Sequence, residues 1–279
     1  MQNNIPKDNA SPMISVIMGV YNGERFLQEA IDSVLSQSYP NFEFVICNDS
    51  SKDGSALILA QYAEKDARIK LLNNEHNLGL AATLNKCISQ ASGKYIARMD
   101  SDDRCLPERF EAQLKWLEDN PSVAALGSAV EFIDDNGHVY GTRKRTGDEY
   151  YSLADAVRQS VLVHPSVMMR KDAVEAVGGY SSNELTTRAE DYDLWCKLCE
   201  SGAVIANTSK ILFQYREDES NIARRKYVYR MQEARLKWHW IRRAKCPLTE
   251  LRYAIKPLIV GLIPHSIYKK MHRRNLTQG

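Results

Sequence analysis

Residues 13–20 read MISVIMGV, an apolar and β-branched run that is too short for a helix. Such a run is typical of a strand buried on both faces. A helical spacing of apolar residues follows at 25–37, and the same alternation continues to residue 99. It predicts further strands at 42–47, 69–72 and 95–99, and helices at 55–67 and 80–91. Because strands that alternate with helices build parallel βαβ units, we expect an α/β fold with a mostly parallel sheet flanked by helices.

The pattern changes after residue 100. A helix is expected from Pro107 to about residue 119, and a hairpin of strands 123–133 and 139–142 turns at 135–137. Shorter elements follow: helices at 153–161, 171–177 and 190–200, and strands at 166–169, 204–206 and 211–215. The chain then reads as a basic helix to about residue 245 and as a shorter amphipathic piece broken by Pro257 and Pro264. We expect a flexible tail at 1–12, a main domain at 13–220 and a basic helical extension at 221–279.

The small net charge of +2 hides an uneven distribution along the 279 residues. Residues 221–279 hold 15 Lys and Arg but only Glu233 and Glu250, a net charge of +13 that leaves −11 for residues 1–220. Basic clusters beside Trp238, Trp240 and the apolar run 258–263 favour either packing on the acidic body or a peripheral contact with an anionic inner membrane surface. Nucleic acid is not expected as a partner, because no recognised motif accompanies the charge.

Six cysteines are scattered along the chain, and only Cys196 and Cys199 are close in sequence. This spacing favours free thiols in a reducing cytosol over a zinc site. Residues 1–11 are polar and lack the apolar segment of a signal peptide. The longest strongly apolar stretch, 258–263, is far shorter than the roughly 20 residues of a membrane-spanning helix. We therefore expect a cytoplasmic protein that does not cross a membrane.

Three carboxylates occur within four residues at Asp100-Ser101-Asp102-Asp103, directly after the fourth expected strand. Carboxylates this close repel one another, and a shared divalent cation relieves the repulsion. Mg²⁺ or Mn²⁺ held by one or two carboxylates is commonly completed by substrate phosphates, so the motif indicates a diphosphate ligand. The alternative is a helix N-cap with an acidic first turn before Pro107, in which Asp103 is the cap.

Other strand ends and one helix start carry candidate site residues. Asp49, one residue past the second strand, is either an acceptor for the N–H of a uracil or thymine ring or an Asx-turn or helix cap before Asp53. Tyr21 follows the first strand and could lie against a base. Asp191 opens an expected helix as either a cap or a general base. No glycine-rich dinucleotide or P-loop motif is present, which disfavours hydride transfer and P-loop chemistry.

Five blocks in this order resemble the family 2 glycosyltransferases of the GT-A fold, over residues 13 to about 216. The blocks are MISVIMGVYN at 13–22, NDSSKDGS at 48–55, NLGL at 77–80, YIARMDSDD at 95–103 and EDYDLW at 190–195. The resemblance implies an inverting transfer from a nucleotide-diphosphate sugar, with residues 13–220 as the catalytic domain. It makes Asp191 the catalytic base and Asp49 a ligand of the nucleotide base.

The same resemblance assigns the acidic motif. Asp100 would contact the ribose or diphosphate, and Asp102, together with Asp100, would hold Mn²⁺ or Mg²⁺. Arg98 either pairs with these acids or touches phosphate, and His164 lies in a segment often found near the acceptor or the diphosphate. The full set of expected nucleotide-sugar-binding residues is Val20, Tyr21, Asn22, Asp49, Asn77, Arg98, Asp100, Ser101, His164 and Glu190.

One departure from the family concerns the number of sugars added. Processive members carry Gln-x-x-Arg-Trp, whereas Gln214-Tyr215-Arg216 lacks the Trp and the spacing. We expect addition of one sugar, with a UDP-sugar donor favoured, to a saccharide or lipid-linked saccharide in surface polysaccharide or lipopolysaccharide synthesis. The alternatives are a sugar-nucleotide pyrophosphorylase, although the expected glycine-rich loop is missing, and a sugar-nucleotide-binding protein without transferase activity.

Overall fold

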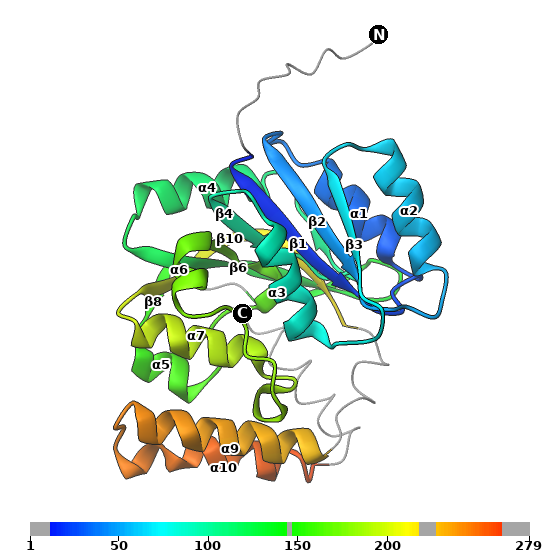
Figure 1. Cartoon of the computed structure of the whole chain (residues 1–279). Helices are drawn as coiled ribbons and strands as arrows, with labels where there is room; N and C mark the ends of the chain where they lie inside the picture. The colour runs from blue at the N-terminus through cyan, green and yellow to red at the C-terminus, as the bar shows by residue number, and fades with distance from the viewer. Residues whose placement is uncertain (1–11, 144–146, 218–226, 264–279) are drawn as a thin grey trace.

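The computed structural model describes residues 12–143, 147–217 and 227–263 (Figure 1). The predictions of a flexible tail before residue 12 and of basic clusters at 224–226, 269–270 and 273–274 lie outside the described residues. Within them, one mixed sheet with strand order β3-β2-β1-β4-β9-β6-β10-β5 forms the centre of the molecule, and helices cover both of its faces. The predicted α/β architecture with a sheet flanked by helices is confirmed.

The N-terminal half is the predicted βαβ arrangement, and each element ends within two residues of its expected bounds. Its four strands pair in parallel in the order β3-β2-β1-β4. The elements are β1 (Ile14–Val20), α1 (Leu27–Leu35), β2 (Phe42–Asn48), α2 (Ser55–Lys65), β3 (Ile69–Asn73), α3 (Leu80–Gln90) and β4 (Tyr95–Arg98).

The second half adds strands of both directions. β9 (Met168–Arg170) lies antiparallel between β4 and β6 (Val123–Ile133), and β10 (Val204–Arg216) runs parallel to β6. Three short strands pair antiparallel with these: β5 (Arg104–Cys105), β7 (Val139–Arg143) and β8 (Glu149–Tyr151). The helical elements are α4 (Arg109–Asp119), α5 (Leu153–Arg158), η1 (His164–Ser166), α6 (Lys171–Ala176), η2 (Glu184–Thr186) and α7 (Glu190–Glu200).

Two predictions about secondary structure were wrong. The strands expected at 204–206 and 211–215 are one strand, because register shifts between Thr208 and Phe213 absorb the polar residues that suggested a break. Pro257 does not end its helix but lies buried inside α10 (Leu251–Val260), where packing offsets the missing N–H. The strands β5 and β8 were not predicted, since two or three residues carry no periodic signal.

Alternate side chains of β1 enter two apolar cores on opposite faces of the sheet. Val16 and Met18 join the core that α1 and α4 cover, whereas Ile17 joins the core that contains residues of α3 and α7. This alternation is the period of two expected for a strand buried on both sides. All six cysteines are free, as predicted, and all but Cys246 are buried.

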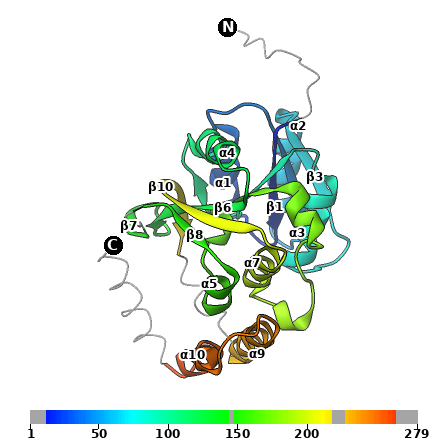
Figure 2. The same cartoon turned by 90° about the vertical axis from the view of Figure 1, so that its left-hand side faces the viewer.

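The C-terminal helices α9 (Tyr227–Arg243) and α10 lie side by side at one end of the molecule, joined through η3 (Leu248–Glu250) (Figures 1 and 2). Leu236, Trp240 and Ala254 belong to the same apolar core as α7. The hairpin is thus packed on the body, and the division into 13–220 and 221–279 stays a prediction. No helix among the described residues has the length and apolar character needed to cross a bilayer.

Candidate active site

The loops that follow β1, β2 and β4 meet at one edge of the sheet, because these three parallel strands are neighbours. After β1, the backbone N–H of Lys52 donates to Oδ1 of Asn22, whose φ of 53° is a left-handed conformation that Asn tolerates. A Cβ on Gly23 would lie 2.9 Å from Oγ of Ser101. Gly23 therefore allows the β1 loop to approach the side chain of Ser101 closely.

Asp49 is buried behind the β2 strand end and accepts three hydrogen bonds. Its Oδ1 accepts from the side chain of Asn74 at 2.7 Å and from the N–H of Leu78 at 2.8 Å, and its Oδ2 accepts from the N–H of Gly79 at 3.0 Å. The side chain of Asn77 donates to the Asp49 carbonyl at 3.4 Å. The carboxylate thus holds the turn that leads into α3, rather than a turn before Asp53, and it fixes the wall of the candidate nucleotide site.

Replacing Asp49 by Asn is expected to destabilise the fold by about 1–3 kcal/mol, because an amide nitrogen cannot accept the N–H bonds that the carboxylate oxygens accept. Urea unfolding at neutral pH measures the loss, with Asp119→Asn at an exposed position of α4 as the matched control. A change below about 0.5 kcal/mol, no larger than that of an ordinary surface substitution, would contradict this role.

The acidic motif forms a compact cluster of carboxylates. Oxygens of Asp100, Asp102 and Asp103 lie within 4.8 Å of one another. Asp103 is not a helix cap, because α4 begins at Arg109 and β5 intervenes. Its carboxyl is buried and accepts the N–H of Arg216 at 2.7 Å, and burial raises its pKa well above the usual value. Asp100 and Asp102 are partly exposed and can meet a ligand, as the metal prediction requires.

Arg216, at the end of β10, fixes the backbone of this motif. Its Nε donates to the Asp102 carbonyl at 2.8 Å and its Nη1 to the Asp134 carbonyl at 2.7 Å. The guanidinium also pairs with Glu29 and lies over the ring of Phe26. From the sequence, Arg216 was predicted only as part of an incomplete processive motif. A residue 113 positions after Asp103 gives no local signal of this contact.

Arg98 is a fully buried cation next to the motif. Its Nη1 lies 2.5 Å from Oδ1 of Asp100, and its Nε has no hydrogen-bond partner within the described residues. Burial raises the pKa values of Glu190 and Asp191, and the positive charge of Arg98 offsets part of this rise. Both predicted alternatives are thus compatible with the geometry, since Arg98 pairs with Asp100 and keeps a donor for a phosphate oxygen.

Glu190 and Asp191 open α7, where the helix N-terminus favours negative charge. Oγ of Ser160 donates to Oδ2 of Asp191 at 3.0 Å. Burial raises the pKa values of both acids, and Asp191 raises that of Glu190 further. A raised pKa makes a carboxylate a stronger base, which suits it to accept a proton from a hydroxyl.

His164 lies in η1 and packs against α7, the helix that these two acids open. Its Nε2 is 2.8 Å from the hydroxyl of Tyr180, and its ring makes edge contacts with those of Tyr180 and Trp195. Burial lowers the pKa of His164 well below its usual value, and the nearby charge of Arg98 adds to this, so the imidazole is neutral. The neutral ring of His164 thus holds the side chains of Tyr180 and Trp195 in place.

The structure therefore brings the residues of the predicted site into two connected groups. Asp49, Asn77, Asn22 and the carbonyl of Val20 line the β1 and β2 ends, and the exposed Tyr21 lies at the rim. Arg98 pairs with Asp100 of the acidic motif, and Glu190 and Asp191 open α7. Three residues that hold predicted site residues in place were not predicted from the sequence: Asn74, Ser160 and Arg216. Of these only Asn74, which follows a strand end, had a recognisable signal.

Residues 15–178 match the model of Glycosyl transferase family 2. The chain belongs to this family. This chain is 39% identical to the putative glycosyltransferase EpsE of Bacillus subtilis over 269 residues, which cover 96% of each sequence. It is 26% identical to WfgD of Escherichia coli, a UDP-Glc:alpha-D-GlcNAc-diphosphoundecaprenol beta-1,3-glucosyltransferase, over 91% of this chain and 95% of that one.

This chain also has the GT-A fold. Its structure matches that of S. aureus TarS 1–349 in complex with UDP-GlcNAc, with a TM-score of 0.64 and 18% sequence identity. The match covers 95% of this chain and 83% of TarS 1–349. The predicted family and fold are thus confirmed.

Proposed function

We propose that this glycosyltransferase moves one sugar from a nucleoside diphosphate sugar to an acceptor hydroxyl with inversion of the anomeric centre. The observation that carries the proposal is that the acidic motif and α7, which Glu190 and Asp191 open, border the same segment, η1. Arg98 pairs with Asp100 and donates its backbone N–H to the carbonyl of Val167, next to η1. His164 of η1 packs its ring against Trp195 of α7. A site for the diphosphate thus adjoins a candidate base. A pyrophosphorylase or a protein that only binds nucleotide sugars would not need a general base at this position.

The donor set at the acidic motif fits a hard divalent cation, Mn²⁺ or Mg²⁺, because carboxylate oxygens of Asp100, Asp102 and Asp103 gather within 4.8 Å. Asp102 and Asp100 would hold the ion, since Asp103 is buried and engaged with Arg216. When bound, the ion neutralises charge that develops on the leaving diphosphate. Arg98 would assist through the hydrogen-bond donor that its Nε keeps available.

Asp191 would act as the general base. Its carboxylate takes the proton of the acceptor hydroxyl as the oxygen attacks the anomeric carbon, on the side opposite the leaving diphosphate. Ser160 orients this carboxylate through its hydrogen bond, and the start of α7 stabilises the charge. Glu190, His164 and Ser101 would line the donor site around it. A single displacement of this kind inverts the anomeric configuration.

The nucleotide would occupy the ends of β1 and β2. Asp49 keeps lone pairs for a pyrimidine N–H beyond the three bonds that it accepts, and Tyr21, which is exposed, can lie against the ring. Val20, Asn22 and Asn77 would complete this wall. This wall suits a pyrimidine nucleotide, and among these we favour UDP because the name of WfgD states a UDP-sugar donor.

The acceptor is proposed to be a saccharide or a lipid-linked saccharide in cytoplasmic assembly of a surface polysaccharide or lipopolysaccharide. WfgD, whose name states a lipid diphosphate acceptor, supports this class. A panel of UDP-, dTDP- and GDP-sugars, each assayed by calorimetry and for transfer to lipid diphosphate-linked sugars, tests the proposal. Binding and transfer with a UDP-sugar are expected, and binding of every donor without transfer or hydrolysis would contradict it.

Ser160→Ala is expected to move the acidic limb of the pH–rate profile to higher pH. The hydrogen bond from Ser160 lowers the pKa of Asp191, so its loss raises that pKa, and the base is then protonated at a higher pH. Profiles of kcat/KM for wild type and for Ser182→Ala, an exposed serine outside the site, serve as references. An unchanged limb in Ser160→Ala would remove Ser160 from the support of the base.

A further inference from the structure

The helix α9 presents one exposed face that mixes apolar and basic side chains. Val228, Met231, Arg235, Trp238 and Arg242 are all exposed and recur at intervals of three and four residues. This spacing places them on one side of the helix. The residues that join the core, Leu236 and Trp240, lie on the other side. The face is therefore turned away from the body.

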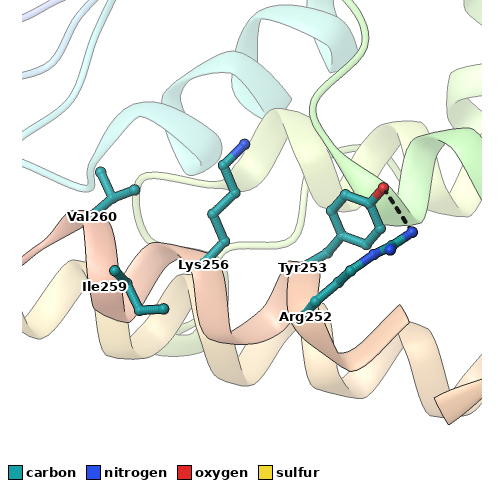
Figure 3. Close-up of a pocket in the computed structure, with 5 residues that line it drawn as sticks. All are labelled: Arg252, Tyr253, Lys256, Ile259 and Val260. Carbon is teal, nitrogen blue, oxygen red and sulfur yellow. Dashed lines mark hydrogen bonds between the residues drawn. The ribbon is translucent and has the colours of Figure 1, made fainter. Parts of the chain in front are cut away.

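The helix α10 and the preceding η3 repeat this composition. Leu248, Ile255, Ile259 and Leu262 are exposed, although water disfavours such large aliphatic side chains. Arg252 and Lys256 are exposed beside them. A depression of about 490 Å³ on this helix is lined by Arg252, Tyr253, Lys256, Ile259 and Val260. Figure 3 shows these five side chains along α10. Cationic groups and aliphatic groups thus border the same hollow.

The acidic side chains between residues 227 and 263 do not neutralise the positive charge of these two faces. Glu233 and Glu250 are the only two, and both form ion pairs. Glu250 is buried and pairs with Arg158 of α5, while Glu233 pairs with Arg230. The exposed charge on these faces of α9 and α10 is therefore positive throughout. We call these two faces the basic apolar face.

We propose that the basic apolar face docks the enzyme on a bilayer that contains anionic phospholipids. The two helices lie side by side at one end of the molecule (Figures 1 and 2). Apolar side chains that enter the headgroup region and cations that pair with lipid phosphates are the two contributions to interfacial binding. A nucleic acid would use the cations but not the exposed Leu and Ile residues. The docking goes beyond the proposed transfer, because none of these residues takes part in it.

The opposite side of the hairpin connects this face to the candidate base. Nε1 of Trp240 donates to Oδ1 of Asp193 on α7 at 2.9 Å, two residues after Asp191. Nζ of Lys237 donates to the Arg158 carbonyl at 3.3 Å, and Arg158 pairs with Glu250 through two hydrogen bonds. Ser160, the partner of Asp191, follows Arg158 closely. Docking would thus set the orientation of the base relative to the membrane.

Co-sedimentation of the full chain with vesicles tests the docking without requiring activity. Wild type is compared on pure phosphatidylcholine and on phosphatidylcholine with 30% phosphatidylglycerol. Arg252→Glu/Lys256→Glu is expected to lower the partition coefficient on the anionic vesicles by at least about tenfold. The matched control is Lys65→Glu/Lys115→Glu, which makes the same charge change on exposed residues of α2 and α4, away from the hairpin.

A second pair of variants tests the apolar part of the face. Ile255→Asn/Ile259→Asn replaces side chains that are 44% and 60% exposed, and Leu57→Asn/Val139→Asn replaces ones that are 66% and 49% exposed elsewhere. Only the first pair is expected to reduce vesicle binding, and circular dichroism checks that both variants are folded. Transfer to a water-soluble acceptor should stay at the wild-type rate in all four variants.

Three results would overturn the docking proposal. The first is equal binding of wild type and Arg252→Glu/Lys256→Glu to anionic vesicles. The second is equal binding of wild type to neutral and anionic vesicles. The third is a concentration-dependent dimer in light scattering that Ile255→Asn/Ile259→Asn dissolves, since the face would then be covered by a second copy. Each result leaves the transfer reaction untouched, so failure of the docking and failure of the proposed function are distinguishable.

Discussion

Asp191→Asn is expected to lower the rate of sugar transfer by about three orders of magnitude or more while donor affinity stays within about twofold of wild type. The substitution keeps the shape of the side chain, and an amide can still accept the hydrogen bond from Ser160. It removes the group that takes the proton of the acceptor hydroxyl. The donor contacts around Asp49 and the acidic motif are unchanged.

Donor binding by calorimetry and transfer from a labelled UDP-sugar, measured on the same preparation, check this prediction. Asp119→Asn, an exposed carboxylate at the end of α4, is the control and should have wild-type activity. Burial raises the pKa of Asp191, so wild-type transfer should decline toward low pH sooner than an ordinary carboxylate would dictate. Normal turnover by Asp191→Asn would remove Asp191 from the mechanism.

Removal of divalent metal is expected to lower turnover at least about a hundredfold, because the leaving diphosphate then lacks its main source of charge stabilisation. Asp102→Asn should have the same effect in the presence of metal. The substitution takes away one carboxylate of the cluster but leaves the Asp102 carbonyl, to which Arg216 donates, in place. The loop should therefore keep its shape.

Two measurements separate metal binding from catalysis. Titration of Mn²⁺ by electron paramagnetic resonance should show one site in wild type, in Asp119→Asn and in Asp191→Asn, and much weaker binding in Asp102→Asn. Activity after chelation should return on addition of Mn²⁺ or Mg²⁺ to wild type. Full turnover in the presence of a chelator, or unchanged Mn²⁺ binding by Asp102→Asn, would refute the role of the acidic motif.

The N-terminal half of the fold could be predicted from the sequence because each of its strands is a short apolar run followed by a helix of regular period. The second half was harder. Its strands β5 and β8 are two and three residues long, and β10 contains the polar stretch Asn207 to Lys210 across a register shift. Long-range pairing holds these elements, and such pairing leaves no local periodicity.

The candidate site could be predicted to the extent that its residues follow strand ends or open a helix. Asp49, the acidic motif and the Glu190–Asp191 pair all satisfy that condition. The residues that position them do not. Arg216 reaches Asp103 from the far end of β10, and Ser160 reaches Asp191 from the segment after α5. Side chains far apart in sequence meet only once the sheet has formed, so no spacing rule indicates them.

The anomeric configuration of the product tests the central claim most directly. A single displacement with Asp191 as base converts the α-linked sugar of a UDP-hexose into a β-linked product. The coupling constant of the anomeric proton in the NMR spectrum of the isolated product distinguishes the two configurations. We predict inversion with wild type and a rate of product formation lowered by about three orders of magnitude or more with Asp191→Asn. A product that retains the α configuration would contradict the account, because retention requires a different set of catalytic groups.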